Sequence, residues 1–140
     1  MPLSQSQSNA GDQIPRRLCV YNTGFLTQER IKRILLLAGW SVSIGRPSGD
    51  DWVGVWGAAP SAKRGLAVAE GRDAPVLRVE DAFLRSLHPG RVDREPPLGL
   101  LLDRTGLHFD ASRPSDLETL LIEDRLDDTA LLTQARDLIA

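Results

Sequence analysis

The sequence predicts an α/β fold, with a parallel sheet and helices on its faces. Short apolar segments rich in β-formers alternate with segments of helical periodicity, and short turns join them. Parallel strands need crossover connections, which the helical segments supply. The hydrophobic fraction of 41% over 140 residues is ordinary for a globular domain. We expect one domain over residues 16–140, after a disordered lead-in at 1–15 that is rich in Ser, Gln and Asn.

The N-terminal third predicts a strand, a turn and a helix. Residues 17–21 are short and mostly apolar, and they end in the turn composition Asn22-Thr23-Gly24. Apolar residues keep roughly helical spacing from Leu26 onward, with Thr27 as a plausible N-cap and Gly39 as the stop signal. These residues predict the first crossover helix.

The middle of the chain repeats this alternation. Strands are expected at 41–44, where the pattern has period two, and in the apolar segments 52–56 and 75–79. A second helix is expected from Pro60 to Gly71, because a proline in the first helical turn loses no hydrogen bond. These segments complete the predicted parallel sheet.

The last third predicts an added β-hairpin and two helices. The apolar run 98–102, the turn 103–106 and the segment 107–109 indicate a hairpin that borders the sheet. Cap residues precede helical patterns at 117–122 and 129–140. The apolar face of the last helix needs cover from this domain or from further sequence, so we expect a fragment of a longer protein.

Charge and composition exclude several function classes. With 17 Lys and Arg against 19 Asp and Glu, the net charge is −2, which provides no basic field for nucleic acid. A single cysteine, Cys19, excludes an internal disulfide and favours the cytoplasm. No apolar run approaches the roughly 20 residues of a membrane span. His88 has no second His or Cys at ligand spacing, so no metal site is expected.

Ligands of open α/β sheets bind beyond the carboxyl ends of the strands, so the segments after each strand contain the candidate site. After the first strand, Asn22 and Gly24 form a glycine turn before a helix, where free backbone N–H groups could hold an anion. A turn with a helix cap explains the same residues, and both interpretations stay open.

A second candidate segment follows the third strand. Gly57 allows a tight turn, and Ser61, Lys63 and Arg64 lie at the start of the next helix, a combination suited to a phosphate or carboxylate. The segment lacks the order of a Walker loop. Alternatively, Lys63 and Arg64 form the solvated face of that helix.

The third candidate segment follows the fourth strand. Glu80 and Asp81 end the strand, and Arg85, Ser86 and His88 come within eight positions. Adjacent carboxylates at the edge of an apolar core are a common way to build an acid, base or nucleophile. Side chains alternate in extended backbone, so Glu80 and Asp81 should point to opposite sides. The alternative is an acidic helix cap with Arg85 as a surface ion-pair partner.

Five motifs carry a family resemblance. They are Trp56-Gly57, Pro60–Gly65, Pro75–Ser86, Pro96–Leu98 and Phe109–Glu118. In order and with consistent gaps, they resemble the N-terminal portion of the capsule polysaccharide biosynthesis and export family over residues 16–125. One departure is Ala82, which stands where the family usually has Gly.

The resemblance implies a bacterial retaining β-Kdo glycosyltransferase, which transfers Kdo from CMP-Kdo to a lipid-linked oligosaccharide acceptor. Such enzymes are GT-B-like, with two facing Rossmann-like domains, and this chain has room for one lobe. CMP-Kdo is then a donor substrate, and no further cofactor is implied. Cytoplasmic location, with peripheral association at the inner membrane, is also implied.

The resemblance implies a catalytic carboxylate at Asp81, with Glu80 as the second candidate, and sugar or acceptor binding by Arg85 and Ser86. Two other functions stay open. One is a noncatalytic remnant that binds an acceptor or a partner protein. The other is a stand-alone nucleotide-binding α/β domain.

Overall fold

The computed structural model describes residues 14–86, 88, 95–125 and 127–139. The chain divides into two compact units, Met1–Leu102 and Asp103–Ala140, and each is described by itself. Of the expected lead-in, only Ile14 and Pro15 are described, and they have no regular secondary structure. The single domain expected over 16–140 stays a prediction.

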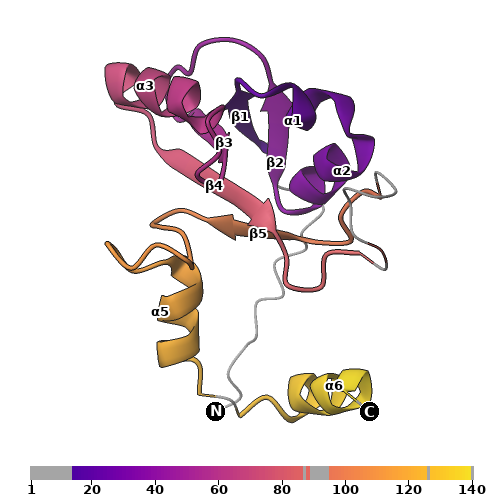
Figure 1. Cartoon of the computed structure of the whole chain (residues 1–140). Coiled ribbons are helices and arrows are strands. Elements are labelled where there is room, and N and C mark those ends of the chain that lie inside the picture. Colours follow the sequence, from indigo (N-terminus) through magenta and orange to yellow (C-terminus); the bar gives the residue numbers. More distant parts are fainter. Residues whose placement is uncertain (1–13, 87, 89–94, 126, 140) are drawn as a thin grey trace. The chain divides into compact units, whose positions relative to one another are not determined.

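The first unit is built on a five-stranded sheet with strand order β2-β1-β3-β4-β5 (Figure 1). The strands are β1 (Arg16–Val20), β2 (Trp40–Ser43), β3 (Trp52–Trp56), β4 (Val76–Asp81) and β5 (Leu100–Asp103). β1 pairs in parallel with β2 and β3, and β3 pairs in parallel with β4. This arrangement confirms the predicted α/β class.

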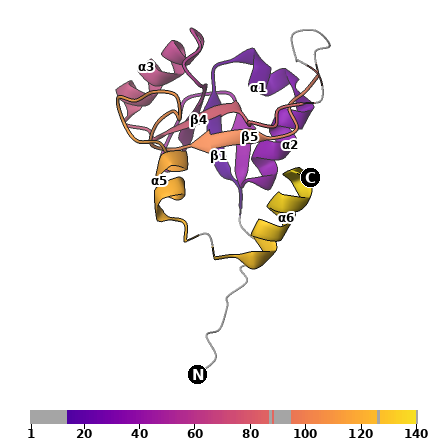
Figure 2. The same cartoon turned by 60° about the horizontal axis from the view of Figure 1, so that its bottom comes forward.

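The edge strand β5 lies beside β4, as Figure 2 shows from a second direction. Its arrow runs opposite to that of β4 in Figure 1, and the backbone N–H of Ala82 donates to the Gly99 carbonyl at 3.4 Å. An antiparallel pair therefore borders the sheet, but β4 and β5 form it. The prediction of a returning strand at 107–109 is wrong, because His108 and Phe109 lie in a turn.

Two helices replace the single helix expected after the first strand. They are α1 (Thr23–Thr27) and α2 (Glu29–Leu37), and Gln28 between them has extended backbone, with φ −96° and ψ 99°. Thr27 is the last residue of α1, so its expected role as N-cap is wrong. The helical turn begins four residues earlier.

Asn22 and the core explain this difference. The Asn22 side-chain oxygen accepts a hydrogen bond from the Gly24 N–H at 2.8 Å, which starts α1 directly after the strand. Phe25 and Ile31 are both buried in one core cluster. In one straight helix, at about 100° per residue, they would lie about 120° apart around the axis. The break at Gln28 lets both face the sheet.

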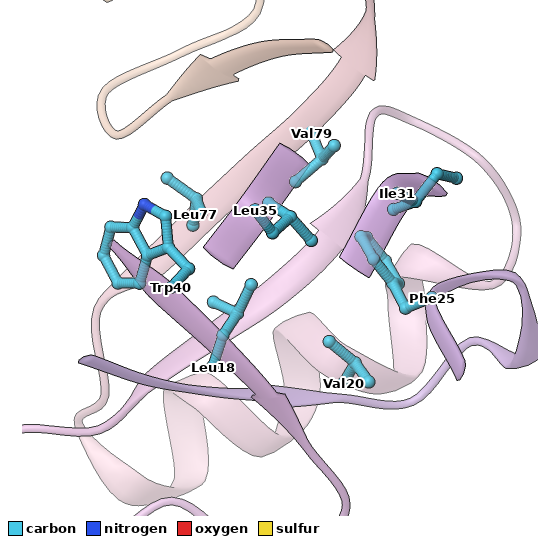
Figure 3. Close-up of a cluster of buried hydrophobic side chains, with 8 residues drawn as sticks. All are labelled: Leu18, Val20, Phe25, Ile31, Leu35, Trp40, Leu77 and Val79. Atoms are coloured by element: carbon cyan, nitrogen blue, oxygen red, sulfur yellow. The ribbon is translucent and has the colours of Figure 1, made fainter. Parts of the chain in front are cut away.

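The sheet has an apolar cluster on each face. The cluster beside α1 and α2 is shown in Figure 3 and consists of Leu18, Val20, Phe25, Ile31, Leu35, Trp40, Leu77 and Val79. The other lies beside α3 (Ala62–Arg72) and consists of Val53, Val55, Ala62 and Ala69. Because Leu77 and Val79 belong to the first cluster, alternation places Asp81 on the α1–α2 side and Glu80 on the α3 side.

The second unit begins with a loop organised by Asp103, which is 3% exposed. Its Oδ1 accepts from the N–H groups of Thr105 and Gly106, at 2.9 and 2.7 Å, and its Oδ2 accepts from the Asp116 N–H at 2.8 Å. These bonds turn the chain toward the next helix, which explains why no strand returns here.

Two helices follow, α5 (Asp116–Glu123) and α6 (Thr129–Ile139). Ser115 caps α5 in a reciprocal capping box with Glu118, and the Asp128 carboxylate accepts from the first N–H groups of α6. Both caps confirm the predicted helix starts. Among the described residues, no helix is long and apolar enough to span a membrane.

Candidate active site

The carboxyl ends of β1, β3 and β4 meet around a pocket of about 300 Å³ in the first unit. It is lined by Asn22, Gly24, Phe25, Gln28, Ile31, Trp56, Asp81 and Arg85. The position matches the expectation for an open parallel sheet, where the loops after the strands form the ligand site. Four predicted site residues, Asn22, Gly24, Asp81 and Arg85, are brought together here.

Asp81 is the acidic group of this pocket, and its two oxygens differ. Oδ2 accepts a charge-assisted hydrogen bond from Arg85 Nε at 2.7 Å. Oδ1 is buried and has no hydrogen-bond partner among the described residues. Buried polar atoms are normally paired, so this unpaired oxygen of a pocket-lining residue makes Asp81 a candidate contact for a ligand.

Arg85 is fixed by the segment that follows β4. Its Nη1 donates to the Ser86 hydroxyl and to the Glu95 carbonyl, both at 3.2 Å. The Ser86 hydroxyl in turn donates to the His88 carbonyl at 2.6 Å. Ser86 therefore positions Arg85 and does not line the pocket. The ion pair of the alternative interpretation exists, but it is half-buried at a pocket, and the described residues 82–86 that follow Asp81 are not helical.

Glu80 lies on the other side of β4, against Gly57. A Cβ at Gly57 would overlap the Glu80 carboxylate and lie 2.5 Å from its Cδ. Gly57 also has a positive φ of 43°, which glycine adopts without strain. Gly57 therefore accommodates Glu80, and neither residue lines the Asp81 pocket. Among the described residues only Asp73 is a non-glycine with positive φ, so Ala82 needs no glycine conformation here.

Asn22 links two of the predicted segments. Its Nδ2 donates to the Ser61 hydroxyl at 2.9 Å, while its Oδ1 caps α1. Ser61 precedes α3 and makes no side-chain cap of its own. The amide of Asn22 therefore joins the end of β1 to the start of α3, and Ser61 supports the pocket wall from outside.

The structure does not bring Lys63 and Arg64 to the pocket. Both are exposed on α3, and the Arg64 guanidinium lies over the Tyr21 ring, 5.8 Å from its centroid. Tyr21 packs on the α3 face and donates to the Gly45 carbonyl at 2.7 Å, and burial raises the pKa of its hydroxyl. Arg64 thus packs on an aromatic ring, on the opposite face of the sheet from Asp81.

A second, larger pocket of about 670 Å³ lies beside the first and shares Gln28 and Arg85 with it. It is lined by residues 27–30, Arg85, Glu95 and Pro96. Sequence reasoning missed residues 27–30 and Glu95, and in the first pocket it missed Phe25, Ile31 and Trp56. The sequence pattern predicts core positions for these apolar residues, and no neighbouring residue indicates a helix break at Gln28.

The fold and site define a class of protein. A parallel sheet with helices on both faces, and a pocket at the strand carboxyl ends, is the Rossmann-like lobe from which GT-B-like glycosyltransferases are built. Among solved structures, the chain is similar to Thermosulfurimonas dismutans KpsC, a beta Kdo 2,4 transferase. The TM-score is 0.71 at 30% identity, over 89% of this chain and 37% of that chain.

The sequence model of capsule polysaccharide biosynthesis proteins matches residues 51–136, more than half of the chain. The chain belongs to the capsule polysaccharide biosynthesis family, which confirms the resemblance predicted from the sequence motifs.

Two curated relatives agree with this membership. The capsule polysaccharide modification protein LipA of Neisseria meningitidis serogroup A is 37% identical over 81 residues, 58% of this chain and 11% of LipA. The lipopolysaccharide-processing protein LpsZ of Rhizobium meliloti is 48% identical over 60 residues, 43% of this chain and 13% of LpsZ. The chain therefore matches only a small part of each relative's length.

Proposed function

We propose that the chain is one lobe of a retaining glycosyltransferase, which transfers Kdo from CMP-Kdo to a lipid-linked acceptor in capsule polysaccharide synthesis. Family membership and the likeness to KpsC support a role related to glycosyl transfer. The observation that carries the proposal is the Oδ1 atom of Asp81, which is buried at the strand carboxyl ends without a hydrogen-bond partner among the described residues.

Asp81 is the nucleophile of this reaction. Oδ1 attacks the anomeric carbon of Kdo, and the bond from that carbon to the phosphate oxygen breaks, so that its electron pair leaves with CMP. The product of this step is a glycosyl ester of Asp81. The acceptor hydroxyl then attacks the same carbon, loses its proton to a base and releases the Asp81 carboxylate. Two inversions at one carbon retain the β configuration.

Arg85 positions this nucleophile. By binding Oδ2 through Nε, it leaves Oδ1 without a hydrogen bond, and we assign the attack on the donor to this oxygen. Its own orientation is set by the Ser86 hydroxyl and the Glu95 carbonyl. Glu80 lies on the opposite side of β4, which favours Asp81 as the catalytic carboxylate.

The test is CMP release from CMP-Kdo with a lipid-linked acceptor, measured on the full-length product of the gene. We expect Asp81→Asn to reduce the rate at least about a thousand-fold, because an amide cannot form the ester. Glu80→Gln is the matched control and should retain most of the activity. With a substrate for which the second step is slow, mass spectrometry should find one Kdo residue on the peptide that contains Asp81.

An Asp81→Asn variant with unchanged CMP release overturns the assignment. If the full-length product binds the acceptor and never releases CMP, the noncatalytic binding module replaces the enzyme as the best interpretation.

A further inference from the structure

The second pocket has a charge distribution that the proposed reaction does not explain. Two arginines line it, Arg30 from α2 and Arg85 from the segment after β4. Two carboxylates, Glu29 and Glu95, line it as well. What the pocket can bind depends on which of these charges already have partners.

Both carboxylates are engaged within the first unit. Glu29 forms an ion pair with Lys32, three residues further along α2. One oxygen of Glu95 accepts a hydrogen bond from the His88 N–H at 2.9 Å. The negative charge of Glu29 is therefore partly balanced by Lys32, and one oxygen of Glu95 is already hydrogen-bonded.

Both arginines have N–H groups that are available as hydrogen-bond donors to a ligand. Arg85 uses Nε on Asp81 and Nη1 on Ser86 and Glu95, and its Nη2 donates to no group that the structure describes. Arg30 is exposed and has no hydrogen bond or ion pair within the described ranges. A guanidinium group is suited to a carboxylate or phosphate because its N–H groups match two oxygens at once.

We propose that this second pocket binds an anionic group of the acceptor, a carboxylate or a phosphate, through Arg30 together with Nη2 of Arg85. Assignment of the anion to the acceptor rests on the proposed function, in which the Asp81 pocket holds the anomeric carbon of the donor. The acceptor hydroxyl must reach that same carbon, so the acceptor lies in an adjoining space. The second pocket adjoins the first through Gln28 and Arg85, and its volume of about 670 Å³ is in the usual range for a small-molecule site.

Arg30 is then a specificity residue for the acceptor, and Arg85 serves both pockets. One consequence is that the two arginines differ in their effects on the reaction. Loss of Arg30 weakens acceptor binding alone, whereas loss of Arg85 also releases Oδ2 of Asp81.

The test measures calorimetric binding of three probes to the full-length gene product. One is a Kdo methyl glycoside, which has a carboxylate and no phosphate. Another is its neutral methyl ester, and the third is an alkyl phosphate without a carboxylate. We expect Arg30→Ala to weaken binding of the recognised anion about ten-fold, as expected for a lost charge-assisted contact, and to leave the neutral ester unchanged. The probe whose binding is weakened by Arg30→Ala identifies the recognised anion as a carboxylate or a phosphate.

Arg33→Ala is the matched control, because Arg33 is exposed on the same helix and lines neither pocket. It should leave all three dissociation constants within two-fold, and Arg30→Lys should recover part of the loss. In steady-state kinetics, Arg30→Ala should raise the KM for the acceptor and leave the KM for CMP-Kdo unchanged.

The proposal is overturned if Arg30→Ala binds every probe as the wild type does, or if it weakens CMP-Kdo and not the acceptor. It is also overturned if the wild type binds the neutral ester at least as tightly as either anion. These outcomes are independent of the nucleophile: an active Asp81→Asn variant contradicts the proposed function and leaves the binding data of Arg30→Ala intact.

Discussion

The two units of the chain are stabilised in different ways. Every buried core hydrophobic among the described residues except Leu107 lies in the first unit, and all of these but Cys19 belong to the two clusters on the two faces of the sheet. The second unit instead has a buried carboxylate, Asp103, and a buried hydroxyl, Ser115, whose partners are backbone N–H groups and the side chains of Thr105 and Glu118. The first unit therefore depends on apolar burial, and the second on polar contacts.

This difference places the candidate site in the better-packed unit. Asp81 follows two core residues of β4, Leu77 and Val79, which are 1% and 0% exposed. The role of nucleophile that we propose for Asp81 needs a fixed position, and a packed strand end provides it. The helices of the second unit bury no residue in the described ranges, and they expose Leu120, Leu121, Ile122, Leu131, Leu138 and Ile139.

The largest expected effect is that of a truncation in the first core. Leu77→Ala should lower the free energy of unfolding by about 2–5 kcal/mol, because it removes buried methyl groups and leaves a cavity. Urea denaturation followed by tryptophan fluorescence measures it, since Trp40, Trp52 and Trp56 all belong to the first unit. Leu36→Ala, at an exposed position of α2, is the control, and an equal loss there would contradict the role assigned to the core.

A smaller and more local effect is expected at Asp103. Asp103→Ala leaves the N–H groups of Gly106 and Asp116 without their acceptor, which should destabilise the second unit by about 1–3 kcal/mol. Amide exchange measures it, and protection should fall at these two amides while the β1 and β3 amides stay protected. Exchange that rises equally in β1 and β3 would show that the two units do not differ in this way.

The smallest effect is expected from acid. Burial alone would raise the pKa of Asp116. Hydrogen bonds from the Arg104 N–H, the Thr105 hydroxyl and the Arg104 guanidinium outweigh this effect, so the pKa is below its usual value of 3.8. A lowered folded-state pKa means that the stabilisation is present above the unfolded pKa and is lost as pH falls through the folded one. The second unit should therefore weaken below about pH 4.

The Arg104 amide proton reports this titration by NMR, because it donates to Asp116 Oδ2 at 2.8 Å. Asp116→Asn should abolish the acid transition of that signal. A transition that persists unchanged in the variant would assign it to another carboxylate.

Much of the fold could be predicted from the sequence. Short apolar segments, with a period-two pattern at 41–44, predicted the parallel strands to within two residues, since each strand buries its apolar positions against a helix. The helix break at Gln28 could not be predicted, because glutamine is a good helix former and the break serves the joint burial of Phe25 and Ile31. The wrong prediction of a strand at 107–109 has a comparable cause, because the Asp103 carboxylate binds the N–H groups of Thr105, Gly106 and Asp116 and so turns the chain toward α5.

The residues of the candidate site could likewise be predicted only in part. Asn22, Gly24, Asp81 and Arg85 could be predicted because each follows a strand whose end lies at one edge of the sheet. Arg30 could not, because only the packing of α2 brings it beside Arg85. Lys63 and Arg64 follow a strand too, but they lie on α3, where Arg64 stacks on Tyr21.

The close approach of Glu80 to Gly57 has an evolutionary consequence. Because the Glu80 carboxylate fills the volume that any side chain at position 57 would need, the two positions cannot both be large. A homologue with a bulkier residue at 57 is expected to have a shorter one at 80. Paired variation at these two strand ends would then trace how the family alters one face of the sheet while Asp81 on the other face stays in place.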